Sequence, residues 1–372
     1  MAVPPGVTGL DRATVVRDGS VVLHEVTLLA EPGELLVVLG PSGSGKSTLL
    51  RAIAGLDRLS AGTVLIAGTP TSSQTHQRDL AMVFERTHLN PVLDVAGNMA
   101  FGLLLHQTPK EEAQRKVEEQ ARLLRLSRLL KRRPTGLSAG EHGQVGIGRA
   151  LVRVPKAFLL DEPLAHLDAQ ERVRMRHLIA DAVKATGVST IYVTHDQTEA
   201  LSIADRIAVL NAGEVVQIAR PQDLYLRPAS IFVADFVGHP SLTQLPARLV
   251  ESGGMAGYRV GARTLPTWAP VPPELAGHVG REVILGVRPE DIQEAAPDSD
   301  PDRAWLPGTV VAAERLGSDT YLTISTAGHR IVGRFPGWNT ARVGDAIDIT
   351  VDAASMHVFD AGTGVALHHP DV

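Results

Sequence analysis

The sequence predicts an α/β domain built on a parallel sheet, followed by a smaller domain of β-barrel type. Predicted strands alternate with helices through residues 1–238, an order that favours a parallel sheet with helices on both faces. From residue 239 onward the chain consists of short β-rich segments separated by Gly, Pro and Asp. The length of 372 residues is more than one domain usually needs. We therefore expect two domains, 1–238 and 239–372.

The first domain starts with residues 13–30, where valines alternate with polar residues and predict antiparallel strands. An apolar run at 35–39 predicts a buried strand that leads through a glycine-rich turn into a helix over 46–54. Thr108 and Glu111, with Pro between them, predict a capping box that opens a helical region over 109–133. The remaining strands and helices are expected at 63–67, 80–84, 145–153, 157–160, 169–186 and 190–194.

The second domain is predicted from β-rich segments alone. Residues 295–302 (AAPDSDPD) are expected to form an exposed loop. The two β-rich stretches on either side of that loop could be halves of a tandem barrel. The expected strands are at 283–287, 308–313, 321–325 and 346–351.

Composition excludes several function classes. The chain has no cysteine, so disulfides and thiolate metal sites are excluded. A net charge of −5 argues against a general nucleic-acid binder, which would usually be basic. The first residues lack a basic start and an apolar stretch, so no signal peptide is expected, and no run approaches the roughly 18 apolar residues of a membrane span. If the protein works at a membrane, other chains must cross it.

Residues 40–48 (GPSGSGKST) match the phosphate-loop pattern G-x-x-x-x-G-K-[ST] between a predicted strand and a predicted helix. The glycines allow a tight turn that aims backbone N–H groups at a phosphate, and the helix N-terminus adds about half a positive charge. Lys46 can reach the β- and γ-phosphates, and the Ser47 hydroxyl can bind Mg²⁺. A chance glycine-rich turn is the alternative. The predicted ATP-binding residues are Gly40, Pro41, Ser42, Gly43, Ser44, Gly45, Lys46, Ser47 and Thr48.

Residues 158–162 (FLLDE) form an apolar strand that ends in two carboxylates, and parallel sheets bind ligands at the carboxyl ends of their strands. Asp161 is expected to hold Mg²⁺ through water, and Glu162 to polarise the attacking water as general base. His195 follows another strand and could contact the γ-phosphate at the same edge. Taken alone, the acidic pair could cap the next helix and the histidine could be structural. The predicted catalytic residues are Lys46, Glu162 and His195.

The segment 137–141 (LSAGE), followed by 148–151 (GRAL) and the acidic strand, resembles the ABC ATPases, whose signature reads LSGGQ. Leu167-Asp168 matches the D-loop of that family, and 192–200 (YVTHDQTEA) matches its switch-histidine segment. Together with further matches, the motifs resemble those of the ATPases of maltose-type and multiple-sugar importers, including glycerol-phosphate importers. The further matches are at 78–84, 98–103, 227–229, 232–234 and 286–292.

The resemblance implies a P-loop NTPase (RecA-like) ABC cassette with an antiparallel β-subdomain and a helical subdomain at about 88–155. It also implies a C-terminal OB-like (TOBE) regulatory β-barrel. In this family two cassettes sandwich two ATP molecules. Ser138 and Gly140 match the signature residues that bind ATP on the opposite subunit, and Asp168 matches the D-loop aspartate.

The resemblance further implies an ATP-hydrolysing motor of an importer, with a carbohydrate as the expected solute. The implied partners are two transmembrane permease subunits, a solute-binding protein, and a second ATPase subunit that is identical or different. Residues 87–93 are the expected docking surface for a permease. The implied location is peripheral, at the cytoplasmic face of the cell membrane.

Several residues depart from the family pattern, and residues 142–144 (HGQ) stand where the family usually has an Arg-rich stretch. Glu85 replaces the Q-loop glutamine that contacts Mg²⁺ and the attacking water. A carboxylate there can still bind the metal, but it adds negative charge near the γ-phosphate. Ala139 and Glu141 replace Gly and Gln of the signature, and Glu141 again adds negative charge facing phosphate. Arg17 lies where the family stacks adenine on an aromatic ring, and its guanidinium plane can take that role. We expect a working ATPase that is slow or tightly gated.

Three alternative functions stay open. Importer ATPases for spermidine, iron or sulfate share much of this layout. A regulatory ABC protein would bind ATP, hydrolyse it poorly and act through its C-terminal domain. A soluble ABC protein acting on DNA or ribosomes is disfavoured by the single cassette and the acidic charge.

Overall fold

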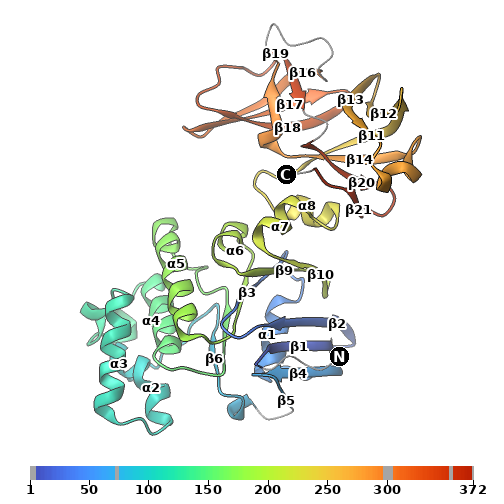
Figure 1. Ribbon diagram of the computed structural model, residues 1–372. Helices are drawn as coiled ribbons and strands as arrows, with labels where there is room; N and C mark the ends of the chain where they lie inside the picture. Colours follow the sequence, from blue (N-terminus) through green and yellow to red (C-terminus); the bar gives the residue numbers. More distant parts are fainter. Residues whose placement is uncertain (1–5, 72–74, 296–304, 352–354, 371–372) are drawn as a thin grey trace. The chain divides into compact units, whose positions relative to one another are not determined.

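The computed structural model describes residues 6–71, 75–295, 305–351 and 355–370 (Figure 1). The chain divides into two compact units, residues 1–221 and 222–372. No helix in the described part of the chain combines the length and the apolar character that a bilayer span requires.

The first unit is built on a six-stranded sheet in the order β10-β9-β3-β8-β7-β6. Its five strands β6, β7, β8, β3 and β9 run parallel, and β10 pairs antiparallel to β9. Every residue of β3, β7 and β8 is buried, as expected of a parallel sheet covered on both faces. The predicted parallel α/β architecture is confirmed. The strands are β3 (Leu35–Leu39), β6 (Leu80–Val83), β7 (Ala157–Asp161), β8 (Thr190–Thr194), β9 (Arg206–Asn211) and β10 (Glu214–Ala219).

A second, antiparallel sheet lies in the same unit in the order β2-β1-β4-β5. Its buried side chains form one hydrophobic core with α1 and one face of the parallel sheet. The valine alternation therefore predicted the β1–β2 pair correctly. The elements are β1 (Thr8–Arg17), β2 (Ser20–Ala30), β4 (Ala61–Ile66), β5 (Thr69–Thr71) and α1 (Lys46–Ala54).

Three helices, α2, α3 and α4, pack against one another (Figure 1). Two expectations for this region are wrong. The helix expected over 109–133 ends at Leu123, and Arg125 adopts a left-handed φ of 57°. Thr108 does not cap α3: the N-cap is Pro109, and no side chain caps this helix start, while the Thr108 N–H donates to the Leu103 carbonyl in the turn after α2. The helices of the unit are α2 (Val95–Leu105), α3 (Lys110–Leu123), α4 (Ala139–Leu151), α5 (Ala169–Thr186) and α6 (Gln197–Ile203), with 3-10 turns η1 (Thr75–Gln77), η2 (Ser127–Leu129) and η3 (Pro134–Gly136).

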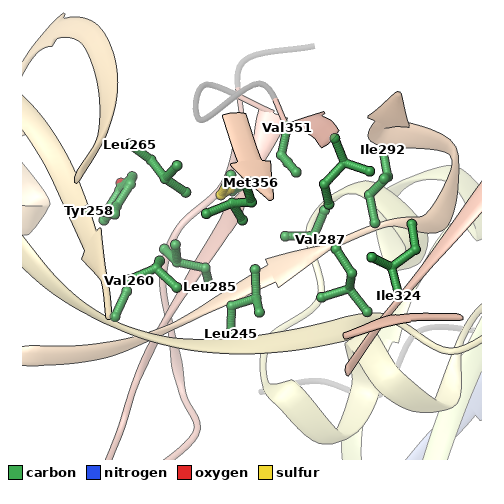
Figure 2. Packing of buried hydrophobic residues seen from close by; sticks show 14 of the residues in the cluster. Leu245, Tyr258, Val260, Leu265, Leu285, Val287, Ile292, Ile324, Val351 and Met356 are labelled. Atoms are coloured by element: carbon green, nitrogen blue, oxygen red, sulfur yellow. The ribbon is translucent and has the colours of Figure 1, made fainter. Parts of the chain in front are cut away.

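The second unit contains a six-stranded sheet in the order β13-β12-β11-β14-β20-β21 and a five-stranded sheet in the order β15-β19-β16-β17-β18. Side chains from both sheets, such as Leu285 and Ile324, share one core (Figure 2). Most of the predicted loop 295–302 lies outside the described residues. The strands are β11 (Thr243–Ser252), β12 (Met255–Val260), β13 (Arg263–Pro270), β14 (Glu282–Val287), β15 (Ile292–Glu294), β16 (Trp305–Arg315), β17 (Asp319–Thr326), β18 (His329–Pro336), β19 (Ala346–Val351), β20 (His357–Asp360) and β21 (Ala366–His368). The 3-10 turns are η4 (Pro273–His278) and η5 (Pro289–Asp291).

The compact units divide after Pro221, whereas the sequence places the domain boundary at 238/239. The structural boundary lies earlier because Arg288, which is 3% exposed, bonds residues 222–238 to the second unit. Its guanidinium donates to the carbonyls of Tyr225, Ala234 and Val237 at 2.8–2.9 Å. These carbonyls belong to the segment that carries α7 (Pro221–Leu226) and α8 (Ile231–Phe236). A buried cation that donates to three carbonyls ties both helices to the second unit.

Burial of His357 in β20 predicts that the second unit loses stability in acid. The imidazole is 3% exposed, and burial lowers the pKa of His357 to about 3, with smaller contributions from Arg288, His369 and His368. The unfolded chain binds this proton near pH 6.5, but the folded unit does not bind it until about pH 3. The stability is therefore complete above pH 6.5 and falls by about 1.4 kcal/mol per pH unit below it.

Urea unfolding followed by tryptophan fluorescence measures this effect in the right unit, because all three tryptophans lie in residues 222–372. We expect a stability loss of about 2 kcal/mol between pH 7 and pH 5 in the wild type, and a smaller one in His357→Gln. An equal loss in both proteins would contradict the assignment to His357.

Candidate nucleotide site

The phosphate loop joins β3 to α1, in the context that the motif predicts. Gly43 and Gly45 have φ values of 80° and 104°, which side chains disfavour. Gly45 is the N-cap of α1, and no side chain caps this helix start. The first N–H groups of α1 are thus open to an anion. A Cβ on Gly40 would lie 2.2 Å from the Leu210 carbonyl oxygen, so the loop also needs glycine there.

Lys46 is held inside this loop. Its side chain is 6% exposed, and Nζ donates to the carbonyls of Gly40 and Pro41 at 2.8 and 2.9 Å. Burial lowers the pKa of Lys46, and the charges of Glu162 and Asp161 oppose that shift. The loop therefore places a cation at its own centre, where a phosphate chain would need one.

Carboxylates gather beside Ser47, whose hydroxyl donates to Asp161 Oδ1 at 3.1 Å. Burial raises the pKa of Asp161, the hydrogen bond from Ser47 lowers it, and the charges of Glu162 and Glu85 raise it again. Among the described residues, no three His, Cys, Asp or Glu side chains could hold a metal ion by themselves. A hard cation such as Mg²⁺ fits the oxygen donors here if water and ligand phosphates complete its shell.

Glu162 and His195 are in direct contact. His195 Nδ1 lies 2.8 Å from Glu162 Oε2, and the two side chains follow the neighbouring strands β7 and β8. Glu162 has a left-handed φ of 45°, a conformation that is rare for a non-glycine residue. Its N–H donates to the Val193 carbonyl at 3.0 Å, which fixes the strained residue against β8. Strained residues of this kind cluster at functional sites.

A buried carboxylate beneath His195 was not anticipated from the sequence. Glu199, 4% exposed, accepts hydrogen bonds from Tyr192 Oη and Thr194 Oγ1, both at 2.9 Å. Thr194 Oγ1 in turn accepts the N–H of Asp196 at 3.0 Å. This network shapes the turn that carries His195. Burial raises the pKa of Glu199, against the two hydrogen bonds that lower it.

The signature segment, residues 137–141, starts helix α4. Ser138 is the N-cap, its Oγ accepts the Glu141 N–H at 3.2 Å, and Glu141 Oε2 accepts the Ser138 N–H at 2.9 Å. The structure thus gives the Glu141 carboxylate a partner within the chain. Residues 138–141 have the pattern S-x-x-E, the sequence signal for such a capping box, so this helix start could have been predicted.

The predicted site residues fall into three places. One group lies where β3, β6, β7 and β8 end, at one edge of the sheet: the phosphate loop, Glu85, Asp161, Glu162 and His195. Ser138, Gly140 and Asp168 line one cavity of about 730 Å³, whose lining contains no phosphate-loop residue. Arg17 is exposed at the β1–β2 turn.

The hairpin that carries Arg17 also reaches the phosphate loop. A Cβ on Gly45 would lie 2.8 Å from Leu23 Cδ2 and 3.1 Å from the Val22 carbonyl oxygen. The β2 strand therefore packs directly on the start of α1, and glycine at position 45 is required by space as well as by backbone conformation.

Comparisons with known proteins agree with this geometry. Residues 23–165 match the ABC transporter family model, and residues 285–359 match the TOBE domain model. The chain is 43% identical over 352 residues to the sn-glycerol-3-phosphate import ATP-binding protein of Cereibacter sphaeroides, covering 93% of this chain and 95% of the relative. It is 41% identical over 354 residues to the trehalose/maltose import ATP-binding protein of Thermococcus litoralis, with the same coverages of 93% and 95%.

A third relative and a solved structure extend the likeness. The trehalose import ATP-binding protein of Mycobacterium tuberculosis is 40% identical over 385 residues, covering 95% of this chain and 96% of the relative. A dimeric ATP-binding cassette in a post-hydrolysis state with ADP and Pi is 29% identical, with a TM-score of 0.53, covering 58% of this chain and 98% of that one. The chain therefore belongs to the ABC transporter family, as one of its ATP-binding ATPase subunits.

Proposed function

We propose that this chain is the motor subunit of an ABC importer whose solute is a carbohydrate or a small polyol phosphate. The contact between Glu162 and His195, beside Lys46 and Ser47, carries the motor part of the proposal because it places a base and a second polar group next to the phosphate cradle. The solute class is supported by the relatives, which are import proteins for sn-glycerol 3-phosphate, trehalose and maltose.

The residues have separate roles in ATP hydrolysis. Lys46 exchanges its bonds to the loop carbonyls for bonds to the β- and γ-phosphates, and the N-terminus of α1 stabilises their charge. Glu162 orients and polarises the attacking water, and His195 contacts the γ-phosphate. Ser47, Asp161 and Glu85 would hold Mg²⁺, which supplies positive charge against the phosphate oxygens.

Two copies are needed for a complete site. The cavity beside Ser138 and Gly140 contains no phosphate-loop residue, so one chain offers the two halves at different places. Pairing of identical copies is the simplest arrangement, and a different ATPase is the alternative partner.

We place the pair at the cytoplasmic face of the membrane, bound to two permease subunits. A solute-binding protein would deliver the solute. Residues 87–93 between β6 and α2 are the proposed docking surface for a permease.

Affinity purification of the tagged chain from detergent-solubilised membranes tests the assembly. Two polytopic membrane proteins are expected to co-elute, and deletion of the gene is expected to abolish uptake of one of the labelled solutes sn-glycerol 3-phosphate, trehalose and maltose. Loss of uptake of a polyamine, iron or sulfate instead would change the solute class. A chain with no membrane partner and no ATP turnover would favour a regulatory ABC protein.

Glu85→Gln is expected to shift the acid limb of the pH–activity profile to lower pH. The charge of Glu85 raises the pKa of Asp161, and Asp161 must be ionised to bind the metal. Removing that charge lowers the pKa of Asp161 and keeps the site active in more acidic solution. Phosphate release measured across pH 5–8 at ATP concentrations well below KM, where the profile reports groups of the free chain, checks this. The matched control is Glu119→Gln on the exposed face of α3. Superimposable acid limbs for wild type and Glu85→Gln would contradict the assignment.

A further inference from the structure

The cavity beside the signature segment has a property that the family motifs do not explain. Its volume is about 730 Å³, within the usual range of small-ligand sites. Besides the signature residues, its lining includes three arginines from outside that motif: Arg125 after α3, Arg128 in η2 and Arg174 in α5.

The acidic groups of this cavity already have partners within the chain. Glu141 accepts the Ser138 N–H, and Asp168 Oδ1 accepts the Glu171 N–H at 2.8 Å. Glu171 Oε2 accepts hydrogen bonds from Gln144 at 3.0 Å and from Arg174 at 2.6 Å. Three acids and three arginines balance in formal charge, but each acid already directs one oxygen to donors of the chain itself, and Arg174 is paired.

Arg125 and Arg128 are the two charged groups of the cavity lining without a partner among the described residues. Both are exposed, and within the described residues neither guanidinium has a hydrogen-bond or ion-pair partner. Both lie in the short segment after α3: Arg125 has a left-handed φ of 57°, and Arg128 lies in η2. The cavity therefore offers free N–H donors with positive charge, and phosphate oxygens, which only accept, are the chemistry that fits them.

The negative charge of Glu141 would oppose an incoming phosphate, and the two arginines can compensate for it. A carboxylate at the N-terminus of α4 uses part of the favourable field of the helix that would otherwise act on an incoming phosphate. Two arginines on the same cavity restore that attraction. We propose that Arg125 and Arg128 bind the phosphates of the nucleotide held by a second copy and so offset the charge of Glu141. This inference rests on the pairing of two copies in the proposed function.

The test measures ATP-dependent dimerisation of the full chain in a Glu162→Gln background, which keeps ATP intact. Analytical ultracentrifugation gives the ATP concentration for half-maximal dimerisation in the background protein and after Arg125→Gln with Arg128→Gln. That concentration is expected to rise at least tenfold in the double variant, with a weaker dependence on salt. Arg58→Gln with Arg115→Gln, two exposed arginines outside the cavity, is the matched control and should change nothing.

Two further arms separate the causes. The affinity of the monomer for a fluorescent ATP analogue should be the same with and without the double substitution, because its own phosphate loop is intact. Glu141→Gln should lower the ATP concentration for half-maximal dimerisation by a larger factor in the double variant than in the background protein, where the arginines already offset that charge. This larger factor is the result that a damaged fold would not produce.

The contrary results are equally specific. Unchanged dimerisation in the double variant, or an equal fall in the monomer's ATP affinity, would overturn the inference while leaving the proposed function intact. Tripolyphosphate binding that the double variant loses without any change in dimerisation would overturn it in favour of a site for free anions. A Glu162→Gln background that never dimerises with ATP would refute the pairing itself.

Discussion

Glu162→Gln is expected to lower ATP turnover by at least about a hundredfold, because a general base typically contributes 10²–10⁴-fold to the rate. The substitution keeps the size of the side chain and leaves an oxygen that can accept the hydrogen bond from His195 Nδ1, now 2.8 Å from the carboxylate. What it removes is the negative charge that polarises water. Nucleotide binding should therefore persist while hydrolysis stops.

Phosphate release by the purified full chain at saturating ATP gives the rate, and equilibrium binding of a fluorescent ATP analogue gives the affinity. Glu119→Gln serves again as the control, since it removes one carboxylate from an exposed face of α3. Equal turnover in wild type and Glu162→Gln would refute the assignment of Glu162 as general base, whatever the affinity for the ATP analogue.

Lys46→Ala is expected to weaken ATP binding by roughly tenfold to a hundredfold, the equivalent of one charge-assisted hydrogen bond at about 1.5–3 kcal/mol. The phosphate chain loses the cation that Nζ supplies when it leaves the carbonyls of Gly40 and Pro41, to which it is bonded at 2.8 and 2.9 Å without ligand. The loss acts on the bound state.

Isothermal titration of ATP into the purified variant measures the change. Lys131→Ala, at an exposed position in the same unit, is the control and should bind as the wild type does. Far-UV circular dichroism establishes that the variant is folded. Wild-type affinity in a folded Lys46→Ala protein would show that the loop binds phosphate through its backbone alone.

The elements that the sequence predicted well are those with a strong local pattern. The buried strands at 35–39 and 190–194 and the helices at 46–54 and 169–186 agree with β3, β8, α1 and α5. The phosphate loop was predictable for the same reason, since its glycines, lysine and hydroxyl are contiguous. Sheet order and strand register in the second unit depend on contacts between distant residues, such as β14 with β11 and β20, and no local pattern encodes them.

Helix caps show where local patterns mislead. Thr108 and Glu111 have the spacing of a capping box, but the N-cap of α3 is Pro109, and α3 starts without a side-chain cap. Ser138 and Glu141 have the same spacing, and there the box forms. The two patterns are alike in sequence, and only the folded chain distinguishes them. Glu199 was missed for a related reason, because its partners Tyr192 and Thr194 become visible as a buried network only when β8 and α6 are in place.

The order of strands in the parallel sheet has a consequence for how activity is lost. β3, β8, β7 and β6 are consecutive neighbours, and each delivers one part of the site directly beyond its last residue. Sliding or fraying of any one strand would pull its contribution out of line with the other three. Gentle warming should thus switch the enzyme off in a single step, at the temperature where amide protons of these four strands begin to exchange with solvent.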